Sequence, residues 1–216
     1  MPEEARRLEL AITIEATPEE VWRAITEGEG ITRWFAPIAS VDPGIGGTIL
    51  LSWGPGMEGK APITAWEPER RFAWTERPGS ELPKMSEFIL ETAEGGRTVL
   101  RLVQSGFGPG ASFDAEYDSA SDGWQSFLQL LRLDLEAHRG MAGRHVFRLR
   151  MGAWDAAALI PVLLRRMAFK REGEHYSAEI AEDMPIHGTV LFERTPGYLI
   201  LSLEAPVPGG GVGAIC

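Results

Sequence analysis

Residues 122–138, DGWQSFLQLLRLDLEAH, carry the pattern that decides the fold of this chain. Apolar side chains recur there at three- and four-residue intervals, which is the spacing of one face of an α-helix. That face comprises Trp124, Phe127, Leu128, Leu131 and Leu135. Ser121 or Asp122 would cap such a helix at its N-terminus. The stretch therefore predicts one long helix whose apolar face must be covered by another layer.

Segments of alternating apolar and polar residues precede this helix and predict β-strands. They are residues 8–15, 38–41, 48–53, 61–66, 71–75, 87–92 and 98–104. Turns rich in glycine and proline separate most of them, which is typical of antiparallel hairpins. Residues 105–121 are expected to form a loop that leads into the long helix. A sheet with one apolar face needs a cover, so we expect the long helix to pack on it.

A helical insertion is expected after the first predicted strand. Thr17 and Glu20 form a capping-box pattern, Gly28 and Gly30 are expected to end the helix, and residues 31–35 predict a second short helical turn. The whole order is a strand, two short helices, about six further antiparallel strands and one long helix. It predicts an α+β fold in which a curved antiparallel sheet wraps around a long C-terminal helix, the helix-grip arrangement.

Several short motifs occur in a fixed order within residues 8–138. They are Ala16–Trp22 (ATPEEVW), Arg33-Trp34-Phe35, Gly46-Gly47, Glu67-Pro68, Arg71-Phe72 with Trp74, Ser105-Gly106-Phe107 and Gly123-Trp124. This ordered set resembles the activator of heat-shock protein 90 ATPase homologue family, within the START-like (SRPBCC) superfamily. The resemblance implies a helix-grip domain. It implies no single function, because the superfamily includes lipid carriers, cyclases, hormone receptors and chaperone cofactors.

The last third of the chain looks like a partial second copy of the first part. Residues 144–151 and 176–180 predict strands, and residues 153–166 predict a helix that Pro161 would kink or shorten. The stretch IHGTVLFERTPGYLILSLEAP then repeats the strand–turn–strand pattern of KAPITAWEPERRFAWTERP. The expected organisation is a START-like domain over 1–139, a partial β-α-β-β-β repeat or α+β extension over 140–206, and a flexible glycine-rich tail over 207–216.

This second set of strands has no long covering helix of its own, so its sheet would expose an apolar face. Leu130, Leu133 and Ala137 form a second, weaker apolar stripe on the long helix. The half-sheet would pack on the outside of the first domain or on the same helix of a partner chain, and the latter arrangement predicts a homodimer. The alternative is that Leu130 and Leu133 are ordinary, partly exposed surface leucines.

The charge of the chain limits its partners. The formal net charge of −10 argues against a nucleic-acid partner and against an anionic membrane surface, since both require a basic face. No apolar run approaches the roughly 20 residues that span a bilayer. The N-terminal residues MPEEARRLEL lack the apolar core of a secretory signal. These features predict a cytoplasmic protein.

The residue types of metal and nucleophile sites form no convincing motif. Cys216 is the one cysteine, and it ends a glycine-rich tail that would not hold a catalytic thiol in place. His138, His145, His175 and His187 lack the spacing of a zinc site, although the last two fall on neighbouring predicted strands. Acidic residues over 114–122 resemble a calcium loop but lack its glycine and terminal glutamate. No metal, no cofactor and no catalytic residue is therefore predicted.

Aromatic and aliphatic residues on the inward faces are the candidate binding site. They are Trp34, Phe35, Leu51, Trp53, Trp74, Phe88, Leu102, Gln104, Trp124 and Phe127. Gln104 shares the strand face of Leu102, so it would place one polar group at the end of an apolar slot, as an orienting contact for a ligand would. The alternative is a filled aromatic core in which Gln104 bonds to backbone at the rim.

The leading hypothesis is a non-enzymatic START-like protein that binds a small apolar or amphipathic ligand between the sheet and the long helix. A chaperone cofactor or protein-interaction module of the heat-shock protein 90 ATPase activator type is one alternative, and its working surface would lie outside the domain. A cyclase- or dehydratase-like enzyme that uses the same cavity is the other. The enzyme would need an acid or base inside the cavity, whereas the predicted inward faces carry Gln104 but no Asp, Glu or His.

Overall fold

The computed structural model describes residues 6–137, 156–181, 184–194, 198–204 and 211–215. Its contacts divide the chain into two compact units, Met1–Phe147 and Arg148–Cys216. The predicted domain boundary at residues 139 and 140, and the predicted strand over 144–151, lie outside the described residues.

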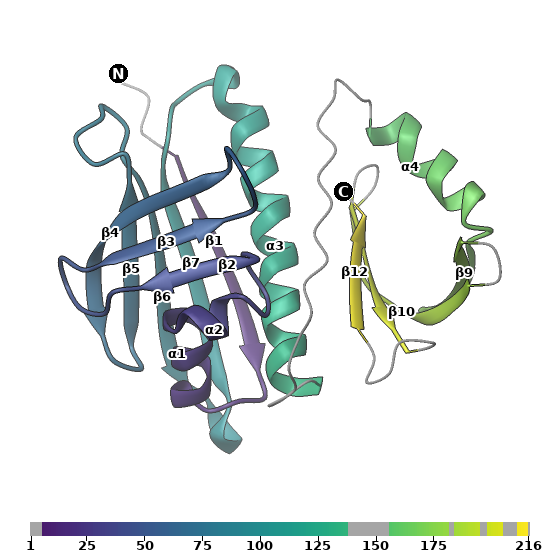
Figure 1. Ribbon diagram of the computed structural model, residues 1–216, viewed down its shortest axis with the longest axis horizontal. Helices are drawn as coiled ribbons and strands as arrows, with labels where there is room; N and C mark the ends of the chain where they lie inside the picture. Colours follow the sequence, from purple (N-terminus) through teal and green to yellow (C-terminus); the bar gives the residue numbers. More distant parts are fainter. Residues whose placement is uncertain (1–5, 138–155, 182–183, 195–197, 205–210, 216) are drawn as a thin grey trace. The chain divides into compact units, whose positions relative to one another are not determined.

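The first unit is an antiparallel sheet with one long helix, α3, alongside it (Figure 1). The strands are β1 (Arg6–Ile14), β2 (Ile38–Val41), β3 (Thr48–Ser52), β4 (Glu58–Glu67), β5 (Arg71–Glu76), β6 (Lys84–Thr92) and β7 (Thr98–Phe107). Their order in the sheet is β1-β7-β6-β5-β4-β3-β2, so successive hairpins run from β2 to β7 and β1 closes on β7. The helices are α1 (Pro18–Thr26), α2 (Gly28–Ile31) and α3 (Asp114–Ala137), with short 3-10 turns η1 (Glu94–Gly96) and η2 (Ala111–Phe113). This is the α+β helix-grip fold that the sequence predicts.

The apolar face of α3 is buried as its spacing requires. Trp124, Leu128, Leu131 and Leu135 are buried, and Phe127 packs against the same core. The core also takes the inward faces of the strands, including Ile14, Leu100 and Leu102. One residue is bulged in β4, because the register with β5 shifts between Ile63 and Ala65. The bulge lets both Ile63 and Trp66 face the core side of β5.

The N-terminal end of α3 differs from the prediction. The helix begins at Asp114 rather than at Ser121 or Asp122, so most of the predicted loop over 105–121 belongs to β7, η2 and α3. Contacts from β1 and β7 stabilise these additional turns of α3. Arg6 forms an ion pair with Asp114, and Phe107 packs edge-on against Tyr117. The acidic residues over 114–122 consequently lie on a helix and do not form a calcium loop.

The helical insertion keeps its predicted cap but has a different second helix. The side chain of Thr17 accepts from the backbone N–H of Glu20, and the Glu20 carboxylate accepts from the backbone N–H of Thr17, which completes the capping box. Helix α1 ends at Thr26, before Gly28, as predicted, but the second helix spans Gly28–Ile31 and includes both glycines, whereas the second helical turn was predicted over 31–35. A Cβ atom on Gly28 would lie 2.7 Å from the carbonyl oxygen of Ala39, and one on Gly30 would lie 2.6 Å from the carbonyl oxygen of Arg23, so these glycines permit α2 to pack closely against β2 and α1.

In its described residues, the second unit has a five-stranded antiparallel sheet and one short helix. Its elements are α4 (Ala156–Arg166), β8 (Lys170–Glu172), β9 (His175–Ala181), β10 (Met184–Arg194), β11 (Tyr198–Leu203) and β12 (Gly211–Ile215), and the strand order is β12-β11-β10-β9-β8. Its core is small and centres on Tyr176, Ile186, Leu199 and Leu201.

The predicted tail over 207–216 is a strand in part, because Gly211–Ile215 pairs with β11 from Leu203 to Leu199. The glycines of this stretch predict a flexible tail, whereas the structure pairs part of it with β11. Strand pairing needs only backbone N–H and C=O groups, and the free edge of β11 offers both. The predicted β-α-β-β-β pattern also omits β8, a three-residue edge strand without apolar alternation.

Candidate functional site

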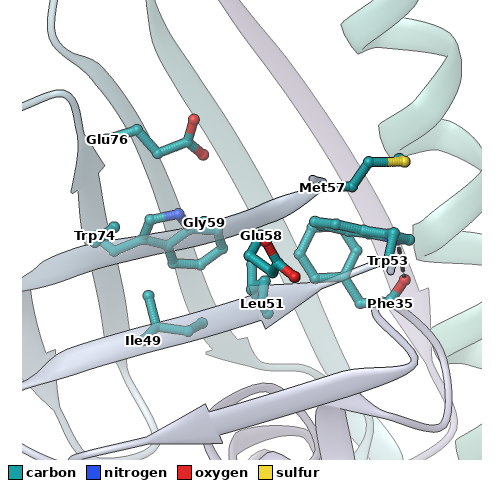
Figure 2. A pocket seen from close by; sticks show the side chains of 10 residues that line it. Phe35, Ile49, Leu51, Trp53, Met57, Glu58, Gly59, Trp74 and Glu76 are labelled. Carbon is teal, nitrogen blue, oxygen red and sulfur yellow. Dashed lines mark hydrogen bonds between the residues drawn. The ribbon is translucent and has the colours of Figure 1, made fainter. Parts of the chain in front are cut away.

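A pocket of about 380 Å³ opens at the β3–β4–β5 side of the first unit, a volume within the range of small-molecule sites. Its lining residues are Phe35, Ile49, Leu51, Trp53, Met57, Glu58, Gly59, Ala61, Trp74 and Glu76. Figure 2 shows Trp74 and Glu76 of β5 on one side and Phe35 with Trp53 on the other. The lining is mainly apolar and aromatic, and it includes two acidic residues, Glu58 and Glu76.

The β3–β4 turn holds one wall of the pocket. Gly54 and Gly56 adopt φ values of 125° and 78°, which glycine enters at little cost. The backbone N–H of Trp53 donates to the carbonyl oxygen of Met57 across the turn at 3.1 Å. The indole Nε1–H of Trp53 donates to the carbonyl oxygen of Phe35 at 3.2 Å (Figure 2). The turn and this hydrogen bond fix the Trp53 ring at the pocket wall.

The register of β3 and β4 determines which residues form the floor of the pocket. Ile49 pairs with Ala61 and Leu51 pairs with Gly59, so these four positions share one face of the β3–β4 hairpin. Gly59 contributes no side chain, and a Cβ atom built on it meets no atom within 4 Å. The absence of a side chain at this position therefore leaves open space within the pocket.

Two carboxylates line the pocket, contrary to the expectation that no acidic residue faces the cavity. Glu76 follows Trp74 by two residues, so it lies on the same face of β5. The prediction ended this strand at Thr75 and so did not consider Glu76. Glu58 is the first residue of β4. The strand was predicted to begin at Ala61, so the sequence pattern assigned Glu58 to neither face of the sheet. Both residues are exposed at the pocket.

Behind the pocket, the aromatic residues of the core pack against one another. The ring of Phe35 stacks on Trp124 with centroids 5.0 Å apart and meets Phe127 edge-on at 4.7 Å. Phe88 lies 5.8 Å from Trp124 and 6.3 Å from Trp34, again edge-on. Such ring pairs stabilise a core beyond the area they bury. Phe35 thus belongs both to the packed core and to the pocket wall.

Gln104 lies inside this core, only 5% exposed, and its amide is engaged by side chains. Its Nε2 donates to Oγ of Ser86 at 3.0 Å, and its Oε1 accepts from Nε1–H of Trp124 at 3.0 Å. These partners differ from the backbone contact that the filled-core alternative expected. They satisfy a buried polar group, and they tie β6, β7 and α3 together.

The structure divides the ten predicted site residues into two sets. Those that line the pocket are Phe35, Leu51, Trp53 and Trp74. Those that do not are Trp34, Phe88, Leu102, Gln104, Trp124 and Phe127. The prediction did not include Ile49, Met57, Glu58, Gly59, Ala61 and Glu76. Strand alternation gave a signal for Ile49, which shares its face with Leu51 and Trp53.

Besides the Arg6–Asp114 pair, two further ion pairs of the described residues connect α3 to the rest of the first unit. Arg33, just after α2, places Nε 2.9 Å from Oδ2 of the mostly buried Asp134. At the other end, Lys84 of β6 pairs with Glu116 and lies 4.9 Å from the centroid of the Phe107 ring. The hydrogen bond from Lys84 lowers the pKa of Glu116, and the positive charges of Lys84 and Arg77 lower it further.

The remaining candidates from the sequence do not form a site in the described part of the chain. His138 and His145 lie outside the described residues. His175 and His187 lie on adjacent strands, opposite Thr189 and Ser177 respectively. Within the described ranges, no group of His, Cys, Asp or Glu side chains is arranged to hold a metal ion. None of the described helices combines the length and apolar character needed to cross a membrane.

Comparison with known proteins agrees with this fold. The family model described as "Activator of Hsp90 ATPase homolog 1-like protein" matches residues 15–136, which is more than half of the chain. The chain belongs to this family. The matched range includes the whole pocket and most of α3. No curated protein matches the chain.

Solved structures of family members and related folds resemble the chain. Protein MLL2253 from Mesorhizobium loti is 27% identical, with a TM-score of 0.54, over 61% of this chain and 97% of that protein. The Aha1 dimer from Colwellia psychrerythraea is 25% identical, with a TM-score of 0.53, over 62% of this chain and 99% of that one. DynU16, from the dynemicin biosynthetic locus, is 18% identical over 93% of this chain and 76% of its own, with a TM-score of 0.55. This last likeness concerns the fold alone.

Proposed function

We propose that this chain is a non-enzymatic START-like protein that binds a small apolar or amphipathic molecule in the pocket beside β3, β4 and β5. The observation that carries the proposal is the open pocket of about 380 Å³ with an aromatic and aliphatic lining. Pockets of this size and character are the usual sites of small-molecule binding. Membership of a START-like family is consistent with ligand binding in general terms.

The pocket walls are held in place without a ligand. Trp53 is fixed by its hydrogen bond to the carbonyl oxygen of Phe35, and Phe35 is fixed by its stacking on Trp124. Trp74 packs against Phe72 and Phe88. Because these rings are already ordered, a ligand would lose little affinity to the ordering of protein side chains. Its affinity would come mainly from apolar surface removed from water.

A substitution that fills the pocket tests the proposal. Gly59→Phe would place a ring in the open space of the pocket, where no atom lies within 4 Å of the new Cβ. Phenylalanine is also favoured in strands, so the fold should tolerate the change. We expect the dissociation constant for N-phenylnaphthylamine, a neutral fluorescent aromatic probe, to rise at least about tenfold. A probe titration with a thermal melt on the same sample measures both quantities.

Lys60→Phe is the matched control. Lys60 is the next residue of β4, it is exposed, and it does not line the pocket. It should bind the probe as the unmodified protein does. If the folded protein binds no probe, or if G59F and K60F bind equally well, the proposed function is wrong.

A second candidate function is suggested by the family description and by the likeness to Aha1 from Colwellia psychrerythraea, namely action on the Hsp90 ATPase as a protein cofactor. Ile38 on the edge strand β2 and Ile45 in the following turn are 58% and 76% exposed, and they offer an apolar contact surface. If this function holds, I38D/I45D should abolish stimulation of purified Hsp90 ATPase, whereas G59F should retain it. Light scattering on the same samples would test the predicted homodimer.

A further inference from the structure

Resting on the ligand-binding function proposed above, we infer that the pocket selects molecules that combine a flat apolar body with a cationic group. Among the residues that the structure describes, the pocket lining contains two acidic residues, Glu58 and Glu76, and no lysine, arginine or histidine. An apolar site that carries charge of one sign discriminates between ligands by their charge.

Neither carboxylate is neutralised within the described part of the chain. The ion pairs of the first unit involve other acidic residues, and Glu58 and Glu76 are absent from all of them. Their negative charges can therefore interact with solvent and with a ligand in the pocket.

The two basic residues closest to Glu76 along the strands form no ion pair with it. Lys84 is the register partner of Glu76 on β6, but its ammonium group pairs with Glu116 and lies over the Phe107 ring. Arg77 follows Glu76 directly, and its charge acts on Glu116, whose pKa it helps to lower. Lys84 therefore strengthens the contact between β6 and α3, and no ion pair of the described residues joins Lys84 or Arg77 to Glu76.

The aromatic walls favour the same ligand class. The rings of Trp53 and Trp74 line the pocket, and Phe35 lies between the pocket and the core. A cation within about 6 Å of such a ring is attracted by the negative face of its π system. A flat apolar body can stack on the same rings. Exposed acidic residues and aromatic rings in the same lining together suit an arylalkyl amine better than a fatty acid.

Three ligands that share one apolar body test this inference: naphthylethylamine, naphthylethanol and naphthylacetate. At low salt, we expect naphthylethylamine to bind about five- to twentyfold more tightly than naphthylethanol, and naphthylacetate to bind least. The carboxylates of Glu58 and Glu76 would attract the amine and repel naphthylacetate, and low salt screens these interactions only in part. The preference should shrink as salt is added. In E58Q/E76Q the amine and the alcohol should bind with nearly equal affinity.

The control is E81Q/E94Q, which removes two exposed carboxylates outside the pocket and gives the same change in net charge. This variant should keep the preference for the amine. Equal affinity for all three ligands would overturn the charge selection while leaving the proposed function intact. A preference for the amine that survives in E58Q/E76Q would also overturn it, since the overall charge of −10 would then be its source. If none of the three ligands binds to the folded protein, the proposed function itself fails.

Discussion

The two units of this chain build antiparallel sheets from similar strand–turn–strand patterns but cover them differently. In the first unit, the 24-residue helix α3 and a set of large aromatic rings form one continuous core. In the second unit, α4 has 11 residues and contains Pro161, and the buried core is a small cluster around Tyr176. Alternating strands therefore specify a sheet, whereas the length and apolar face of the covering helix determine how large a core forms on it.

The largest effect should follow from removal of the central ring of the first unit. Trp124→Ala deletes a ring that packs against Phe35, Phe88 and Phe127, and it leaves the Gln104 amide without its donor. We expect the free energy of unfolding to fall by about 3–5 kcal/mol. Chemical denaturation followed by tryptophan fluorescence measures this loss.

Hydrogen exchange on the same variant tests whether the two units are independent. Amides of β5, β6 and β7 should exchange faster, whereas those of β9, β10 and β11 should not change, because the two units have separate cores. Equal acceleration in both sets of strands would contradict the account of two separately stabilised units.

Loss of an ion pair should also destabilise the first unit more than the second, although by less than the loss of Trp124. Asp134 and Arg33 have side chains that are 10% and 29% exposed, so Asp134→Asn removes the charge of a mostly buried carboxylate that pairs with the Arg33 guanidinium. The expected loss of stability is about 1–3 kcal/mol. The Arg171–Glu193 pair of the second unit is exposed on both sides, and Glu193→Gln should cost less than about 0.5 kcal/mol. If the two variants lose equal stability in denaturant melts, burial does not distinguish the pairs.

Tyr176 gives the second unit a specific response to alkaline pH. Burial, and then the charge of Glu204, raises the pKa of Tyr176 to about 12. Because the folded state disfavours tyrosinate, this stabilisation is complete below the ordinary pKa of 10.0 and is lost as the pH rises through about 12. The tyrosinate absorbance of the wild type minus that of Tyr176→Phe should titrate near pH 12. A difference curve centred near pH 10 would show that Tyr176 is solvated.

Glu116 should give the first unit a weak response to acid. The hydrogen bond from Lys84 lowers the pKa of Glu116 below its ordinary value of 4.5. Its stabilising effect is therefore present above pH 4.5 and is lost as the pH falls through the lowered pKa. Because the Glu116 side chain is half exposed, Glu116→Gln should cost only about 0.2–1 kcal/mol at neutral pH. A difference from the wild type that persists unchanged below pH 3 would contradict this assignment.

Local sequence patterns were sufficient to predict the fold of the first unit. The buried face of α3 follows from the spacing of Trp124, Leu128 and Leu131, and the capping box of α1 follows from Thr17 and Glu20. The first residue of α3 could not be predicted from local patterns, because contacts with residues distant in the sequence stabilise its first turns. The Arg6–Asp114 pair spans 108 positions in the sequence. Strand β12 was missed for a related reason, since pairing to β11 uses backbone groups that residue type does not reveal.

The candidate site was predictable only in part. Alternation identified the inward-facing residues, but it could not show which rings pack against one another and which face open space. Phe35 and Trp53 line the pocket, whereas Trp124 is enclosed by its neighbours. The difference depends on the missing side chain at Gly59 and on the β3–β4 turn. Both are consequences of three-dimensional packing, which a single strand pattern does not contain.

The position of the bound ligand is the most direct test of the central claim, and the indole N–H signals in a ¹H–¹⁵N spectrum report it. During a titration with naphthylethylamine, the account predicts that the signals of Trp53 and Trp74 shift, because these rings line the pocket. Trp34, bonded to the carbonyl oxygen of Ala24, and Trp124, bonded to Gln104, should stay in place. Shifts at Trp34 and Trp124 without shifts at Trp53 and Trp74 would place the ligand between the sheet and α3, and would contradict the account.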